Sequence, residues 1–307
     1  MRDIHTITDT VNLCKALASP VRIQILKLIA ERKQINMNDI AESLGLTNGA
    51  ITQHMKSIIE ADLVEFMYTP GKRGSQKICV LKEHKFMIDV LSQLDHSSMY
   101  QTEIPVGTYT RYSIFPTCGI ATKTSLIGEA DDPRYFDDPL VNDAGILWFS
   151  RGFVEYRVPN YLRPHQGLDE IQISFEISSE APGVCSNWPS DIHFAVNDIP
   201  LGYWTSPGDF GGAVKGLFTP DWWDPNWNAW GVLKLLSVTK EGTYIDGGKI
   251  SDVNIDALNI TPQSSIDFRI SVPEDAVNIG GATLFGKGFG NYNQDIKVRM
   301  IFTADAP

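Results

Sequence analysis

Glycine, proline and tryptophan are distributed so unevenly that the two ends of this chain favour different kinds of fold. Of 307 residues, the first 100 hold four of the 25 glycines, two of the 17 prolines and none of the seven tryptophans. The first 100 residues are also nearly neutral, so the acidic excess behind the net charge of −11 lies after them. Such a break indicates a domain boundary, and one core rarely supports a chain of this length. We predict two domains, residues 1–97 and 98–307.

The first 100 residues have the periodicity of short amphipathic helices. In SPVRIQILKLIAERK, Ser19 can cap a helix and Pro20 fits its first position. The apolar side of this helix is expected at Ile23, Leu26, Leu28 and Ile29. The next segment, NMNDIAESLG, predicts a helix capped at Asn36, ended by Gly45 and apolar at Ile40, Ala41 and Leu44.

A third helix, NGAITQHMKSIIEADLV, has two different faces. Thr47 or Asn48 can cap it, and its buried stripe is expected at Ile51, Met55, Ile58 and Ile59. The opposite face carries no carboxylate and comprises Asn48, Gly49, Thr52, Gln53 and Lys56. Amides can pair with base edges and lysine can reach phosphate, so this face suits a DNA major groove. An ordinary solvent-exposed face is the alternative.

A basic hairpin is predicted directly after this helix. LVEFMYT and QKICVL are β-rich runs on either side of PGKRGS, which places Lys72 and Arg73 at the tip. A basic hairpin after such a helix is typical of a winged helix-turn-helix, whose wing lies along the DNA backbone or minor groove.

The segments LCKALASPVRIQILKLI and MNDIAESLGLTNGAITQHMKSIIEADLVEF together resemble the ArsR-type winged-helix transcriptional regulators, over about residues 8–95. The resemblance implies that Thr47 to Lys56 form the recognition helix, with His54 packing or facing phosphate, and that PGKRG is the wing. It also implies a homodimer interface made by the first helix and a helix around HKFMIDVLSQL. A cytoplasmic repressor of a two-fold double-stranded DNA operator is expected, with half-sites about one helical turn apart.

The sequence departs from that family's pattern at two places. Asp62 stands where the family often has glycine, so the turn after the recognition helix can differ. The segment INMNDIAESL lacks the cysteine pair of the metal-sensing members, and MIDVLSQLDHSS offers one histidine. We therefore expect no metal and no cofactor. The four separated cysteines are expected to be reduced thiols, with a disulfide framework or a zinc site as the alternative.

From IPVGTYTRYSI onward, the alternation of apolar and polar residues predicts strands. The runs ILWFSRGFVEYRVP, DEIQISFEISS, SDIHFAVND, SSIDFRISVP and NQDIKVRMIFTA are separated by turn residues, and no long amphipathic helix follows residue 98. This pattern predicts an antiparallel β-sandwich or jelly roll, and the whole chain an α+β multidomain protein. Residues 95–105, DHSSMYQTEIP, are expected to form the hinge between the domains.

Four of the seven tryptophans lie in TPDWWDPNWNAWG, where acidic, amide and proline residues make a core strand improbable. Indole faces beside carboxylates and amides suit sugars, because sugar C–H faces stack on indole and hydroxyls pair with Asp and Asn. Trp148, in the run ILWF, is expected in the core. The candidate ligand residues are Trp222, Trp223, Trp227, Trp230, Trp188, Trp204, Asp221, Asp224, Asn226 and Asn228. Strand-rich domains with loop tryptophans resemble carbohydrate-binding modules in general character. A different small ligand, or purely structural tryptophans, are the alternatives.

These observations predict a regulator whose acidic domain senses a mono- or oligosaccharide inducer and leaves DNA to the first domain, since its charge repels phosphate. The chain shows no signal peptide and no membrane-spanning run, so no membrane partner is expected. GGATLFGKGFG lacks the P-loop Gly-Lys-Ser/Thr, and no other catalytic motif occurs. Two alternatives remain: a glycoside-active enzyme, which needs two carboxylates beside the tryptophans, or an oligomerisation or protein-docking module without a ligand.

Overall fold

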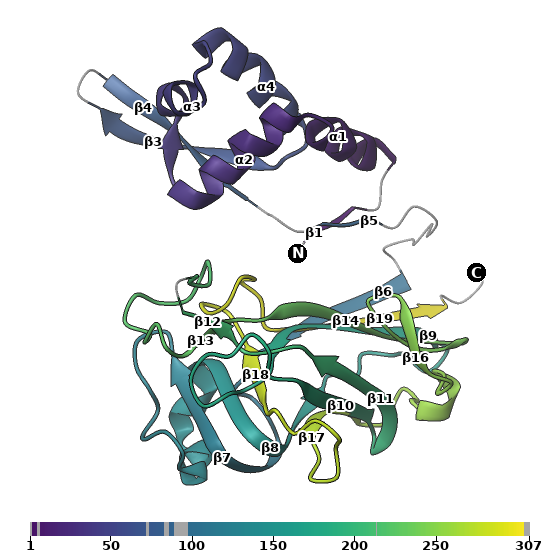
Figure 1. The fold of residues 1–307 in the computed structure, drawn as a ribbon. Helices are drawn as coiled ribbons and strands as arrows, with labels where there is room; N and C mark the ends of the chain where they lie inside the picture. Colours follow the sequence, from purple (N-terminus) through teal and green to yellow (C-terminus); the bar gives the residue numbers. More distant parts are fainter. Residues whose placement is uncertain are drawn as a thin grey trace. The chain divides into compact units, whose positions relative to one another are not determined.

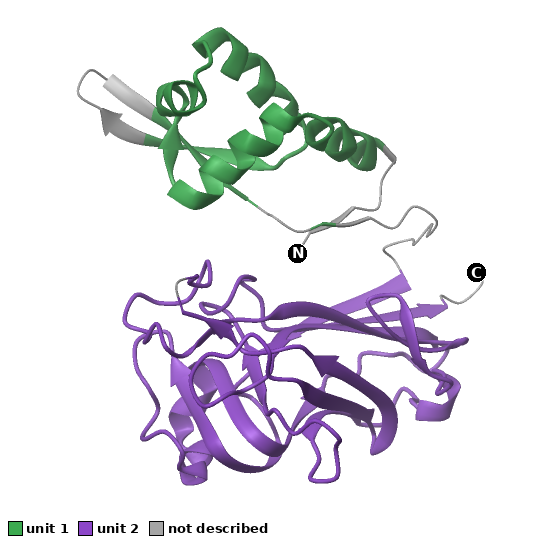
Figure 2. Cartoon of the chain, viewed as in Figure 1, with its two compact units in different colours: residues 1–94 green, residues 95–307 purple. Residues whose placement is uncertain are grey.

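The chain separates into two compact units, residues 1–94 and residues 95–307 (Figure 2). The structure is a computed structural model that describes residues 2–4, 7–71, 74–82, 86–88, 98–212 and 214–303. The first unit is mainly helical and the second is built of strands (Figure 1). Each unit has its own hydrophobic core. The predicted α+β multidomain organisation is confirmed at this level.

The described part of the N-terminal unit has four helices and a small antiparallel sheet. The helices are α1 (Ile7–Leu17), α2 (Pro20–Arg32), α3 (Met37–Leu44) and α4 (Asn48–Glu60). The sheet has the strand order β2 (Ile35–Asn36), β4 (Gly74–Leu81) and β3 (Val64–Gly71), in which β3 and β4 form the predicted hairpin.

Local hydrogen bonds set the turn between α3 and α4. The side chain of Asn36 accepts a hydrogen bond from the N–H of Asp39 at 2.9 Å and caps α3. Gly45 ends α3 with φ of 64°, a left-handed conformation that glycine adopts without a Cβ penalty. The hydroxyl of Thr47 accepts from a backbone N–H at 3.2 Å and caps α4. The predicted helix–tight turn–helix is therefore confirmed.

The helices differ from the sequence prediction at three positions. Ser19 precedes α2 in extended conformation, but its side chain makes no capping hydrogen bond among the described residues. In α2 the fully buried residues are Ile25 and Ile29, whereas Ile23 is half-buried. Ile59 was expected in the buried stripe of α4 and is instead 40% exposed. Successive helical residues point about 100° apart, so Ile59 points away from the core because Ile58 faces it.

The helix expected around HKFMIDVLSQL is wrong over Phe86–Ile88. These residues form strand β5, which pairs in parallel with β1 (Arg2–Ile4), so their backbone groups bond across to the start of the chain. Residues 89–97 lie outside the described part of the chain. The homodimer interface that we expected there stays a prediction.

The described part of the C-terminal unit is almost wholly β-structure, with three short 3₁₀ helices. These helices are η2 (Pro133–Asp137), η3 (Pro139–Asp143) and η4 (Asp256–Leu258). The strands are β6 (Met99–Ile104), β7 (Arg111–Thr122), β8 (Ala144–Val158), β9 (Gly167–Ser178), β10 (Ser190–Val196), β11 (Ile199–Ser206), β12 (Phe210–Gly211), β13 (Asn228–Trp230), β14 (Val232–Thr239), β15 (Gly242–Ile245), β16 (Gly248–Ser251), β17 (Ile266–Val272), β18 (Ala282–Phe285) and β19 (Ile296–Thr303).

Twelve of these strands form one antiparallel sheet that curls into a nearly closed barrel. Strand β18 pairs with both β8 and β9, and so joins the half containing β7, β8, β17, β10 and β11 to the half containing β9, β14, β19 and β6 (Figure 1). Side chains from both halves fill the core: Phe175 of β9 lies 5.4 Å from Phe194 of β10 and 5.8 Å from Phe268 of β17, between ring centroids.

The antiparallel, strand-rich architecture predicted for this unit is confirmed. The five quoted alternating runs correspond to β8, β9, β10, β17 and β19. The hinge expected at residues 95–105 is wrong over Met99–Ile104, because this segment is strand β6 and pairs along its length with β19. A strand held by a ladder of hydrogen bonds in a sheet cannot serve as a hinge.

Candidate functional site

Helix α4 exposes the polar face expected of a recognition helix. Thr47, Asn48, Gly49, Thr52, Gln53 and Lys56 are exposed, and His54 is half-buried. The inner face is closed by Ile51, Met55 and Ile58, which are at most 1% exposed. Burial of the apolar stripe therefore holds the amides and the ammonium on the opposite side, in solvent. Lys72 and Arg73, the predicted wing tip, lie outside the described residues.

The turn after α4 is stabilised by an ion pair. Asp62 has φ of 55°, in the left-handed region where glycine is the usual residue. Its carboxylate lies 2.6 Å from Nζ of Lys82, which follows β4. The N–H groups of Asp62 and Leu63 donate to carbonyls of the last turn of α4. The chain thus keeps the left-handed turn with an aspartate in place of glycine.

A cavity of about 280 Å³ opens in the C-terminal unit beside the tryptophan-rich segment. Three of the ten candidate ligand residues line it: Trp223, Trp227 and Asn228. Trp148 of β8 forms another wall. We expected this residue in the core, and it is indeed largely buried, at 9% exposed. The remaining lining residues are Thr117, Ala130, Asp131, Ile146, Glu180, Ala181, Pro182, Gly183 and Thr283.

The other candidate tryptophans lie elsewhere. The indole N–H of Trp222 donates to the backbone carbonyl of Lys123 at 2.7 Å. Trp230 stacks on Phe210, with ring centroids 4.5 Å apart. Trp204 packs against the sheet core, and the ammonium of Lys234 lies 4.2 Å from its ring centroid. Trp188 is 37% exposed.

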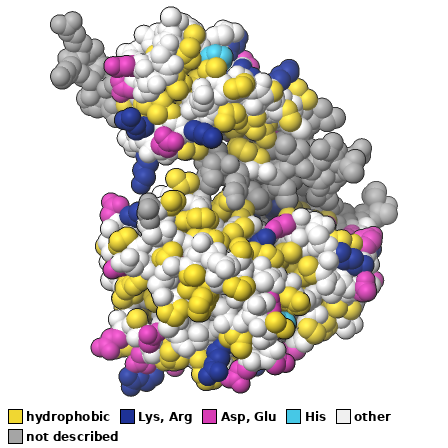
Figure 3. Space-filling view, viewed as in Figure 1, with side chains coloured by type: hydrophobic (Ala, Val, Ile, Leu, Met, Phe, Trp, Pro, Cys, Tyr) yellow, Lys and Arg dark blue, Asp and Glu magenta, His cyan; other side chains and the backbone are white. Residues whose placement is uncertain are grey.

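The candidate carboxylates and amide of the same segment also lie outside the cavity lining. Asp221 forms an ion pair with Lys215 at 2.7 Å. Asp224 accepts a hydrogen bond at 2.8 Å from the N–H of Asn226, which holds the local turn. In the view of Figure 3, apolar side chains are spread over the surface of the C-terminal unit among acidic and basic ones. The sequence could not separate turn-forming from cavity-forming groups in this segment.

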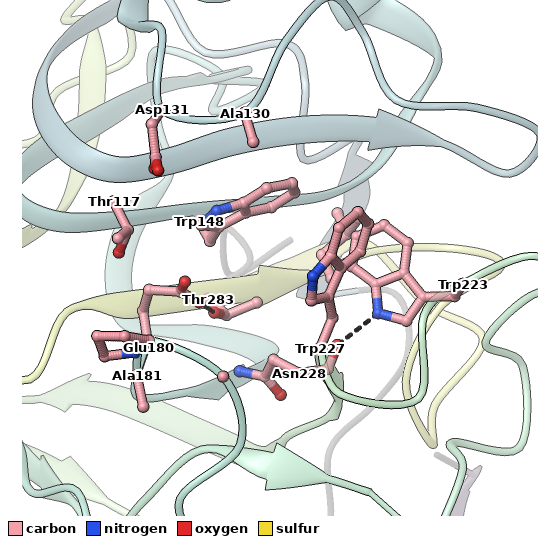
Figure 4. A pocket seen from close by; sticks show the side chains of 13 residues that line it. Thr117, Ala130, Asp131, Trp148, Glu180, Ala181, Trp223, Trp227, Asn228 and Thr283 are labelled. Carbon is pink, nitrogen blue, oxygen red and sulfur yellow. Dashed lines mark hydrogen bonds between the residues drawn. The ribbon is translucent and has the colours of Figure 1, made fainter.

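Edge-to-face contacts hold the cavity tryptophans. The rings of Trp148 and Trp223 meet at 81° with centroids 5.8 Å apart, and those of Trp223 and Trp227 at 73° and 4.9 Å. The indole N–H of Trp223 donates to the carbonyl of Asn228 at 2.9 Å (Figure 4). Phe289 closes the buried side of Trp223, at 5.0 Å and 80°. Trp148 and Trp227 therefore both pack against the ring of Trp223, which sets their orientation.

A buried glutamate fixes the loop that carries Phe289. Glu176 of β9 is fully buried and accepts hydrogen bonds from the backbone N–H groups of Gly231, Asn291 and Tyr292 at 2.8–3.0 Å. Gly290, with φ of 71°, brings its backbone so close that a Cβ would lie 2.4 Å from the carboxylate. Gly290, in the segment GGATLFGKGFG, thus permits close packing around Glu176.

Acidic groups stand at the opposite side of the cavity from Trp223 and Trp227 (Figure 4). The carboxyl group of Glu180 accepts a hydrogen bond from the hydroxyl of Thr283 at 2.8 Å. Burial, together with the charges of Asp209 and Asp131, raises the pKa of Glu180 well above its usual range. Burial raises the pKa of Asp209 to about 7, although the N–H of Ala181 donates to its carboxylate at 2.9 Å.

Asn228 lines the cavity, and its side-chain amide is fixed by two hydrogen bonds. Its side-chain N–H groups donate to the hydroxyl of Ser178 at 2.6 Å and to the carbonyl of Ser179 at 2.9 Å. Its Oδ1 is buried and has no hydrogen-bond partner among the described residues. A buried amide oxygen without a partner is costly to leave unpaired, and this one has almost no accessible surface.

Sequence reasoning missed Glu180, Thr117 and Thr283 as cavity residues. Asp131 stood only among many loop carboxylates, with nothing to single it out. These four residues come from separate parts of the chain and meet only because β7, β8 and β18 are adjacent in the sheet. No group of three or more His, Cys, Asp or Glu side chains in the described ranges is arranged to hold a metal ion. None of the described helices is long and apolar enough to cross a membrane.

Comparison with known proteins gives matches in the N-terminal unit. Residues 19–65 match the family of bacterial regulatory proteins described as the arsR family. An uncharacterised HTH-type transcriptional regulator of Methanocaldococcus jannaschii is 32% identical over 81 residues, which cover 26% of this chain and 84% of that protein. The family match includes α2, α3, α4 and the start of β3.

Proposed function

Since the chain belongs, through its helix-turn-helix unit, to the ArsR family of bacterial regulatory proteins, we propose that it is a DNA-binding transcriptional regulator. Helix α4 is the recognition helix, and Asn48, Thr52 and Gln53 face base edges in the major groove. Lys56, His54 and the residues of the wing tip, Lys72 and Arg73, contact the phosphate backbone. Thr47 and Gly49 lie at the start of α4, where the backbone approaches the DNA.

The exposed face of α4 is the observation that carries this proposal. Amides, hydroxyls and an ammonium project from its first turns without a carboxylate, and its exposed acid, Glu60, lies in the last turn. The opposite face is fully buried. The C-terminal unit holds the acidic excess of the chain, so phosphate contact is confined to the N-terminal unit.

The test is a pair of matched double variants. Gln53→Ala with Lys56→Ala should weaken binding at least ten-fold to DNA fragments enriched from a random pool by the unmodified protein, because base and phosphate contacts are lost. Loss of one phosphate contact per subunit should also lower the salt dependence of binding, by about one unit of slope for each subunit bound. Fluorescence anisotropy at several salt concentrations measures both.

The control is Gln24→Ala with Lys27→Ala, which removes the same two residue types at the same spacing from the exposed side of α2. This variant should bind DNA as the unmodified protein does. Equal affinity of the α4 variant and this control would refute the assignment of α4.

The C-terminal unit is the receptor for a small inducer, for which we favour a mono- or oligosaccharide. One observation supports a receptor: a cavity of about 280 Å³ walled by Trp148, Trp223 and Trp227. Indole faces stack on sugar rings, and the carboxyl groups of Glu180 and Asp131 pair with hydroxyls.

The regulator acts as a homodimer on a two-fold operator and releases it when the inducer binds. Coupling of this kind requires the ligand to bind one dimer geometry more tightly than the other, whatever its absolute affinity. We propose that the bound regulator represses transcription, because the resemblance to the ArsR family implies repression.

Glycoside hydrolysis is a second candidate function, because Glu180 and Asp131 both line the tryptophan cavity. A glutamate with a raised pKa suits a general acid, and a second carboxylate suits a nucleophile or base. Release of the aryl group from aryl glycosides by the full-length protein would establish this activity. Saturable sugar binding without release would favour the receptor.

A further inference from the structure

We propose that the ligand of the tryptophan cavity carries a protonated amine, and that an amino sugar is the class of saccharide it takes. This inference rests on the receptor function proposed for the C-terminal unit and specifies the charge of its ligand.

The charged groups at the cavity are all acids. Glu180 and Asp131 line it, and Asp209 lies behind Glu180, close enough to raise its pKa. Among the described residues that line the cavity there is no Lys, Arg or His. Sugar phosphates and uronic acids would meet uncompensated negative charge in a partly enclosed site, where such repulsion is strong. A cation would meet the carboxyl groups of Asp131 and Glu180 and no basic side chain among these lining residues.

The aromatic walls favour the same sign of charge. The rings of Trp148 and Trp227 stand at 81° and 73° to that of Trp223, so the indoles enclose the cavity from different directions. An ammonium group is attracted to the face of an aromatic ring, most strongly to tryptophan, and the attraction grows when the site excludes water. A flat neutral sugar needs only one open indole face, whereas several differently oriented indoles surround a compact cation.

The hydrogen-bonding groups are matched to an ammonium donor. An ammonium group has three N–H donors and no acceptor. The cavity offers the carboxyl groups of Glu180 and Asp131 as acceptors.

The proton on Glu180 gives the proposal a signature of its own. Burial raises the pKa of Glu180, which favours the protonated form of this group before the ligand arrives. An ammonium beside it favours the ionised carboxylate and lowers that pKa, so binding of a cation releases a proton. A neutral sugar gives no reason for the proton to leave.

The test compares glucosamine, galactosamine and mannosamine with their neutral parent hexoses, by calorimetric titration of the full-length protein. We expect at least one amino sugar to bind ten-fold or more tightly than its parent. The binding enthalpy should also depend on the ionisation heat of the buffer, in the sense of proton release. A neutral hexose that binds as tightly as its amino counterpart would overturn the amine but leave the receptor standing. Failure of all six sugars to bind would overturn both the amine and the saccharide receptor.

Variants of the two acids locate the effect. Glu180→Gln and Asp131→Asn should each remove most of the preference for the amino sugar, so that the amino sugar and its neutral parent bind the variant with similar affinity. The matched control is Asp224→Asn, which removes an exposed carboxylate of the tryptophan segment that does not line the cavity. If Glu180→Gln and Asp131→Asn both keep the full preference, the carboxyl groups do not recognise the amine and the proposal fails.

Discussion

At the scale of single residues, tryptophans that look equivalent in the sequence have different surroundings. Trp222 and Trp223 are adjacent, yet Trp222 is 38% exposed and hydrogen-bonded to a backbone carbonyl, whereas Trp223 is 6% exposed at the centre of an aromatic cluster. Trp227 lines the cavity and keeps 36% exposure. The acids Glu180 and Asp131 complete the cavity although no pattern in the sequence distinguished them. The sequence shows the identity of each side chain but not which side chains surround it in space.

Trp227→Ala should weaken binding of whichever hexose or amino sugar binds the unmodified protein by about ten-fold, since one lost aromatic contact of about 1.4 kcal/mol corresponds to that factor. Quenching of tryptophan fluorescence in a sugar titration measures the effect.

Trp188→Ala is the matched control, because Trp188 is 37% exposed but does not line the cavity. Sugar affinity should be unchanged in this variant. The cavity would not be the binding site if the two variants lost affinity equally.

At the scale of elements, local sequence determined the helix-turn-helix and the long strands. Caps at Asn36 and Thr47, and a glycine between them, are short-range signals that act within one turn of backbone. The strand β5 (Phe86–Ile88) was missed because its partner β1 is more than 80 residues away in the sequence. Likewise, we expected a hinge at β6 because no local pattern shows its pairing with β19, at the other end of the unit.

Gly45→Ala should destabilise the N-terminal unit by about 1 kcal/mol, because φ is 64° there and an alanine Cβ disfavours the left-handed region. Helical circular dichroism during urea unfolding measures the loss.

Gly49→Ala is the comparison, since a Cβ at either glycine meets no atom within 4 Å and Gly49 lies in the first turn of α4. This variant should be neutral or slightly more stable, because alanine is the better helix former. A loss at Gly49 equal to that at Gly45 would show that conformation at the turn is not the cause.

At the scale of the whole molecule, the two units can be followed separately because all seven tryptophans lie after residue 147. Tryptophan fluorescence therefore reports unfolding of the C-terminal unit alone. This unit also holds three acids with raised pKa values, Glu180, Asp209 and Asp295.

Ionisation of Asp209 should make the C-terminal unit less stable as pH rises. Its pKa is raised to about 7 from the usual 3.8, so between these values the folded protein holds a proton that the unfolded chain has lost. The stabilisation is complete below about pH 4 and is lost as pH passes 7, by at most about 4 kcal/mol at about 1.4 kcal/mol per pH unit. Burial lowers the pKa of His193 and acts in the opposite sense near pH 6.5, so the comparison needs a variant.

The measurement is urea unfolding followed by tryptophan fluorescence from pH 5 to 8, for the unmodified protein and for Asp209→Asn. The free energy of unfolding should fall with pH more steeply in the unmodified protein. Asp224→Asn, at an exposed position, should follow the unmodified protein. Parallel curves for Asp209→Asn and the unmodified protein would contradict the role of Asp209.

The sequence by itself determined the division into two units, the helix-turn-helix with its polar face, the wing hairpin and the antiparallel strands, because each depends on periodicity or capping within a few residues. Only the tertiary structure decided which tryptophans share a cavity and which acids face them. Glu180 follows β9, Asp131 follows β7 and Trp148 lies within β8, so their meeting depends on strand pairing across the sheet. Contacts between residues so distant in sequence are set by the packing of the whole sheet, which no local pattern encodes.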